Sequence, residues 1–120
     1  SNLGGGVGPG PWSVSAGIDP ANSERAIDLI LSEIRRFTEK LVTADELADS
    51  TAHYVGRLPL SLESNAGVAS ALLALERYDL GLDYYQRYPG LVQSITREDI
   101  LAAARRYLDP DRLAIALAGP

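Results

Sequence analysis

His53 is the only imidazole in the 120-residue chain, which contains no cysteine. Thiolate zinc sites, iron–sulfur ligation and cysteine nucleophiles are therefore excluded for this chain, as is any zinc site that needs two imidazoles from it. Asp49 and Arg57 lie four residues to either side of His53, on the same face of an expected helix. This spacing does not provide the partners that a metal ligand or a general base needs. We interpret His53 as a structural or solvent-facing residue.

Serine hydroxyls and paired carboxylates would suit nucleophilic and acid–base catalysis. Ser13, Ser15 and Ser61 lack the Gly-x-Ser-x-Gly elbow of hydrolase nucleophiles, and the single histidine is poorly placed for three candidates. We interpret them as strand and turn hydroxyls. The carboxylates stand in the first turns of expected helices, where the helix dipole accounts for them. They are Asp45, Glu46 and Asp49 in one helix and Glu98 and Asp99 in another.

A tyrosine group could stack a ligand: Tyr84, Tyr85 and Tyr88, with Arg87 among them. Tyr84 and Tyr88 are, however, i,i+4 neighbours, a spacing that favours a packed helix face over a binding platform. We interpret the group as core.

The first eleven residues contain five of the eleven glycines and two prolines. Such a segment favours a connector or hairpin loop over regular structure. A phosphate-binding reading fails because Pro9 or Pro11 falls where the last glycine of Gly-x-Gly-x-x-Gly belongs, and no Gly-Lys-Ser/Thr follows. Residues 1–11 are thus predicted to be a Gly/Pro-rich loop before a single domain at 12–120.

The charge balance argues against a nucleic-acid partner. The formal net charge is −5 and the sequence pI is near 4.7, whereas a phosphate backbone calls for a clustered basic face. There is no uninterrupted apolar run of about 18 residues, so no membrane span is expected. Cytoplasm and periplasm are both compatible with the sequence. Because the chain lacks methionine, we expect it to be a processed product or a piece of a longer protein.

Hydrophobic periodicity predicts helices between two strands. Residues 12–18 and 113–117 alternate as strands do. Thr43 to Glu46 forms a capping box, and Thr96 to Asp99 resembles one. The expected helices cover 20–41, 43 to Pro59 (where a kink or stop is expected), 65–77, a short stretch from 84, a further turn from Pro89, and 97–107. The predicted fold class is α+β, with several helices packed on a small, mainly antiparallel sheet.

The order of these segments resembles the carboxy-terminal domain of pitrilysin/insulinase-type (inverzincin) zinc metallopeptidases, including bacterial relatives of the mitochondrial processing peptidases. No single motif is diagnostic, but the ordered set covers nearly the whole chain. The segments that carry the resemblance are Gly10–Asn22, Ala26–Ile27, Val42–Leu47, Gly56–Ser64, Ile95–Ile100, Ala103–Arg112 and Gly119–Pro120.

The resemblance implies the non-zinc-binding half of a peptidase chamber that closes against a homologous amino-terminal domain around a peptide substrate. It places the His-x-x-Glu-His zinc site in that other domain, and a substrate-contacting Arg and Tyr before the position of Ser1. We therefore expect zinc in the parent protein, no metal, catalytic residue or cleavage activity in this chain, and a candidate chamber loop at Gly4, Gly5, Gly6 and Gly8.

Two further expectations follow. The alternative function is a non-catalytic structural or interaction domain, because the same family is thought to include subunits that have lost their zinc ligands. Two strands alone leave open edges and an uncovered face, so the isolated chain is expected to form a homo-oligomer.

Overall fold

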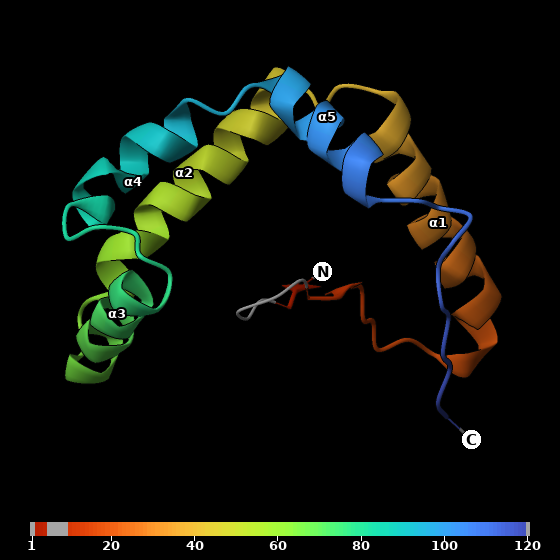
Figure 1. Ribbon diagram of the computed structural model, residues 1–120. Helices are drawn as coiled ribbons and strands as arrows, with labels where there is room; N and C mark the ends of the chain where they lie inside the picture. The colour runs from red at the N-terminus through yellow and green to blue at the C-terminus, as the bar shows by residue number, and fades with distance from the viewer. Residues whose placement is uncertain (1, 5–9, 120) are drawn as a thin grey trace.

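The computed structural model describes residues 2–4 and 10–119, and the chain in these ranges is mostly helical (Figure 1). Two very short strands and a 3₁₀ turn precede the helices: β1 (Asn2–Leu3), β2 (Trp12–Ser13) and η1 (Pro20–Asn22). The α-helices are α1 (Ser23–Glu39), α2 (Ala44–Ser61), α3 (Asn65–Arg77), α4 (Tyr84–Gln93) and α5 (Arg97–Tyr107).

Both predicted capping boxes are confirmed. At the start of α2, the Glu46 backbone N–H donates to the Thr43 hydroxyl (3.1 Å), and the Thr43 N–H donates to the Glu46 carboxylate (2.7 Å). At the start of α5, Thr96 and Asp99 make the same reciprocal pair, at 3.1 and 2.9 Å. Each box satisfies donors that a helix start leaves without an intrahelical partner, so local sequence alone defines these two starts.

The turn between α2 and α3 requires a glycine. The Gly67 N–H donates to the Ser64 hydroxyl (3.0 Å), which caps α3. A Cβ at position 67 would collide with the carbonyl oxygen of Ser61. The close approach lets α3 leave α2 at a bend of 113°.

The stop expected as one outcome at Pro59 and the separate turn expected from Pro89 are not found. Pro59 does not stop α2, which continues to Ser61, and Pro89 does not begin a separate turn but lies inside α4. A proline inside a helix loses one hydrogen bond to the carbonyl four residues earlier. Pro59 stands in the last turn of α2, and the Leu62 N–H donates to its carbonyl (3.0 Å), so little helix follows that could be disrupted.

The predicted α+β class is contradicted, because no layered sheet exists in the described ranges. The β structure there is limited to the antiparallel β1–β2 pair, with Asn2 opposite Ser13 and Leu3 opposite Trp12. The predicted strand at 113–117 is absent, and the one at 12–18 is reduced to two residues. Alternating residues make a strand only where a neighbouring backbone is available for pairing, and these two segments do not pair with each other.

The chain forms an open arch with two arms (Figure 1). One arm contains α1 and α5, which pack on each other, and the other contains α2, α3 and α4, where α2 contacts α4. The radius of gyration is 17.3 Å, against about 14 Å for a compact domain of this length. The accessible surface is 9435 Å², against about 6,300 Å² for a compact monomer of this mass.

The core is correspondingly small. In the described part of the chain, the buried apolar residues are Ile34, Val42, Leu75 and Ala104, while sixteen large hydrophobic side chains are exposed. Among the described residues, no single helix has both the length and the apolar character to cross a bilayer; α2 and α3 meet that test only when counted together across their bend.

A candidate site: an open apolar groove on helix α1

The α1 arm contains a groove of about 340 Å³ whose floor is the apolar face of α1. The residues on this floor are Ala26, Ile27, Ile30, Leu31 and Ile34. Ile27, Ile30, Leu31 and Ile34 recur at helical spacing in the sequence, which places them on one face of the helix. The helix thus presents its expected face, but open space lies over part of that face instead of a sheet.

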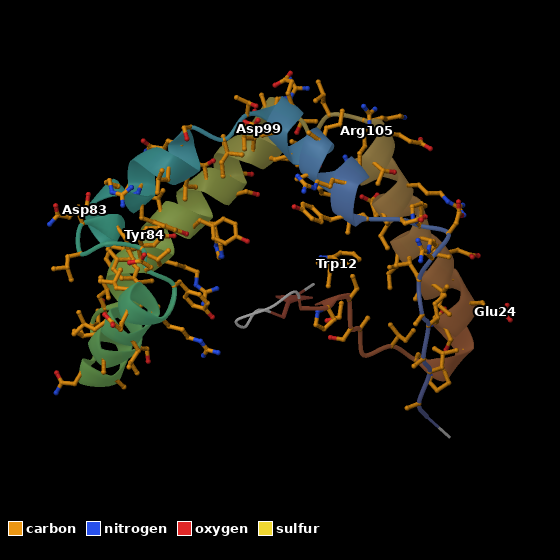
Figure 2. The ribbon with its side chains drawn as sticks, viewed as in Figure 1. Trp12, Glu24, Asp83, Tyr84, Asp99 and Arg105 are labelled. Carbon is orange, nitrogen blue, oxygen red and sulfur yellow. The ribbon has the colours of Figure 1, made fainter. Side chains whose placement is uncertain are left out.

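Two extended segments form the banks of the groove. Residues 12–16 and Ile18 line one bank, and residues 113–117 line the other. The carboxy-terminal segment runs along α1, and Trp12 lies inside the arch (Figures 1 and 2). These are the two segments predicted as strands, and both lie against α1, although only Trp12 and Ser13 form a strand.

A second hollow of about 440 Å³ lies beside the first. Trp12, Val14, Ile30 and Ile34 line both hollows. The second is completed by Leu29, Glu33, Phe37 and Leu108. Because the same bank borders a hollow on each side, the apolar face of α1 is wider than the two extended segments can cover.

The charged groups nearest to this face lie at the junction between α1 and α2. The Arg36 guanidinium donates to Glu33 (2.8 Å) and to Glu46 (3.1 Å). These hydrogen bonds, that to Glu33 foremost, raise the pKa of Arg36. The pKa of Glu46 is lowered, mainly by the Thr43 backbone N–H that it accepts. This cluster ties the two arms together, whereas the lining of the first groove, within residues 2–4 and 10–119, contains no charged side chain.

The structure does not assemble a catalytic group around His53. His53 is exposed on α2, and its ring meets that of Tyr54 edge-on at 5.7 Å. Ser13 and Ser15 line the groove, while Ser61 lies at the end of α2, where its hydroxyl donates to the Leu58 carbonyl (2.7 Å). Among the described residues, no three or more His, Asp or Glu side chains form a group that could hold a metal.

The tyrosine group belongs to the other arm and is half-buried. The Tyr84 ring meets those of Tyr85 (5.3 Å) and Tyr88 (6.0 Å) edge-on, and the Tyr85 hydroxyl donates to a carbonyl of α3 at 3.4 Å. Burial, followed by the effect of Tyr84, raises the pKa of Tyr88. Arg87 instead pairs with Asp83 at 2.7 Å. The group contacts α3 through Tyr85 but is not part of the buried core, contrary to what its spacing suggests.

The candidate chamber loop is described only at one end. The Gly4 N–H donates to the Pro11 carbonyl (2.8 Å), which extends the β1–β2 pairing by one bond. Gly5, Gly6 and Gly8 lie outside the described residues. Asn2 and Leu3 form strand β1, so this part of the segment 1–11 predicted as a loop has regular structure.

No protein-family model, curated protein or solved structure matches this chain. The resemblance to the pitrilysin/insulinase-type peptidases therefore stays a prediction from the sequence.

The groove is the feature that the sequence analysis did not locate. The sequence contains the separate signals, because the two alternating segments and the helical spacing of apolar residues in α1 each predict an apolar face. The sequence could not show that the three faces meet with space left between them.

Proposed function

We propose that this chain is part of a zinc-dependent endopeptidase that hydrolyses peptides or small proteins, and that it forms the non-zinc-binding half of the substrate chamber. The proposal rests on the ordered set of segments between residues 10 and 120 that resembles the carboxy-terminal domain of such enzymes. Its partners would be a homologous amino-terminal domain and the peptide substrate.

The observation that carries the proposal is the open arch with its uncovered apolar surface. A self-contained domain of this mass would expose about one-third less surface than the 9435 Å² found here. A chain that forms one wall of a larger chamber is expected to have such a shape, because its remaining contacts come from the opposite wall. The hairpin at Gly4 and Pro11 lies between the two arms, where a chamber loop would be placed (Figure 1).

In this proposal the chain contributes shape and not a reacting group. Its described residues do not fit a zinc site, so the metal, whose chemistry would be to activate a water for attack on the peptide carbonyl, is assigned to the other domain. The role left to this chain is to enclose the substrate and to limit the size of what enters.

The competing proposal is a non-catalytic interaction domain of the same family. The exposed apolar side chains favour it equally, because large exposed apolar surface marks protein–protein contact. The two proposals differ in whether the complete protein, or a partner encoded beside it, contains a zinc-binding motif.

The decisive experiment starts from the gene. The coding sequence around Ser1 should encode a homologous domain with a His-x-x-Glu-His motif, in the same or a neighbouring reading frame. The complete gene product should cleave a quenched fluorescent peptide, 1,10-phenanthroline should abolish the cleavage, and residues 1–120 alone should cleave nothing. A complete product without the motif would refute the peptidase and leave the interaction domain. Chelator-sensitive cleavage by residues 1–120 would refute the assigned role.

A further inference from the structure

Beyond the paired residues Trp12 and Ser13, the two banks of the α1 groove carry backbone groups that have no hydrogen-bond partner among the residues that the structure describes. Apart from turn bonds accepted by Asp19 and donated by Arg112 just outside them, residues 14–18 and 113–119 make no backbone hydrogen bond to any described residue. Extended backbone that is left open in this way is a template for strand pairing. The floor between the banks is apolar. A polypeptide segment bound here would form backbone hydrogen bonds with the banks and bury apolar side chains against the floor.

These features define the chemistry of the occupant. A compact apolar ligand would fill the space but leave the backbone donors and acceptors of both banks unmatched. An extended polypeptide with apolar residues at alternate positions satisfies both, because its side chains alternate between the floor and the open side. The chain itself has two segments of this type, Trp12–Ile18 and Leu113–Leu117.

The exposed area is sufficient for a second copy. The surplus over a compact monomer is about 3,100 Å² per chain. Stable obligate dimers bury about 2,000–5,000 Å² in total, or half of that per partner. One such interface therefore fits within the surplus of a single chain, and it would bring the exposed surface closer to that of a compact protein.

Charge does not oppose this contact at the groove itself. Each copy has a net charge of −5, but none of the described residues that line the first groove is charged. Figure 2 shows Glu24 on α1 pointing away from the inside of the arch. Two copies can thus meet through this face without placing like charges opposite each other.

We propose that a second copy of this chain covers the α1 groove by pairing its extended segments with the open banks. Each copy receives and provides the same surface, so the assembly is a symmetric dimer in which association adds β structure to the β1–β2 pair. Residues 14–18 and 113–117 then acquire the strand conformation that their alternation predicts. This inference does not rest on the peptidase proposal: dimerisation is measured on residues 1–120 alone, and the presence of a zinc motif does not affect it.

Trp12 gives the experiment a reporter at the site. It is the only tryptophan in the chain and lines both hollows. Residues 1–120 should elute as a dimer by size exclusion with light scattering. On dilution, dissociation should shift Trp12 emission to longer wavelength and remove strand signal from the infrared amide band, with the same concentration dependence in all three measurements.

Matched variants test the surface. Ile115→Lys and Leu117→Lys place a charge on the bank at side chains that are 57% and 68% exposed, so neither is expected to disturb the core. Because a symmetric dimer contains each substitution twice, we expect association to weaken by about 100-fold. Leu73→Lys, at an equally exposed position of α3 (70%), is the control and should leave the dimer intact. Ala116→Pro removes a backbone N–H without adding charge and should also weaken the dimer.

Three results would overturn the proposal. The first is a chain that stays monomeric up to millimolar concentration with unchanged Trp12 emission. The second is a dimer that Leu73→Lys disrupts while Ile115→Lys does not, which would place the interface on the other arm. The third is a monomer whose Trp12 emission shifts only when a synthetic strand peptide is added, because the groove would then accept a strand from another protein.

Discussion

Replacing Ile34 by alanine tests whether this side chain is well packed although an open groove lies beside it. Ile34 is only 6% exposed, which makes it one of the few buried residues of the α1 arm, yet it lines both hollows. The substitution removes three carbon atoms, and the transfer free energy of about 0.8 kcal/mol per buried carbon predicts a loss of about 2.4 kcal/mol.

Because the groove is open, the destabilisation by Ile34→Ala is expected in the lower part of the range that is usual for such truncations. Truncating a buried isoleucine to alanine costs about 2–5 kcal/mol, and the upper part of that range reflects a sealed cavity. At Ile34 the space left by the side chain would join hollows that are already open, so no sealed cavity forms. We therefore expect about 2 kcal/mol of destabilisation and no more.

The measurement is urea unfolding followed by far-ultraviolet circular dichroism, at one protein concentration below the dissociation constant of any dimer. Leu29→Ala on the same helix is the control. Leu29 is 57% exposed, so its loss should cost about 1 kcal/mol or less. Equal effects of the two substitutions would show that α1 has no packed point at Ile34. A loss above about 4 kcal/mol would indicate a sealed cavity and refute the open groove.

Three further predictions concern the ties between elements. Thr43→Ala removes the α2 cap and should lower the free energy of unfolding by about 1 kcal/mol in the same urea assay. Accepted hydrogen bonds lower the pKa values of Glu46 and Asp99 from their ordinary values of 4.5 and 3.8. The contribution of these two carboxylates to the free energy of unfolding is therefore complete at neutral pH and is lost as the pH falls through and below those values. A pH series of thermal melts in which stability rises on acidification would contradict this. Arg97→Gln loses a 2.6 Å hydrogen bond to the carbonyl of the α1–α2 link and should cost about 1.5 kcal/mol, whereas Arg105→Gln, whose bond is more exposed, should cost less.

The helices could be predicted from the sequence because their signals are local. The segment 65–77 and the end of α5 at Tyr107 agree with the periodicity, and the capping boxes mark the starts of α2 and α5. α2 and α4 pass through Pro59 and Pro89, although each proline removes one backbone hydrogen bond. At Pro59 the disruption is small because α2 ends two residues later.

The sheet could not be predicted because strand formation is not local. Alternation at 12–18 and 113–117 indicates one apolar face, and that face does rest on α1. Pairing depends on which backbone lies alongside, and a gap separates the two segments. The site was missed for the same reason, since a groove between segments about 100 residues apart in sequence has no signature within either of them.

The few buried residues are divided between the two arms, and this division determines how binding at one arm affects the other. The arms are joined near the top of the arch, where Arg36 reaches Glu46 and Arg97 reaches Val42, so each arm keeps its own small core: Ile34 and Ala104 lie in one, and Leu75 in the other. Covering the α1 groove would therefore stabilise α1, α5 and the extended segments directly, and would act on α2–α4 through these polar contacts and through the α1–α2 link, where Val42 is buried. Hydrogen bonds of this kind each contribute about 1–3 kcal/mol, so association at the groove is expected to stabilise the α1 arm more than the other arm.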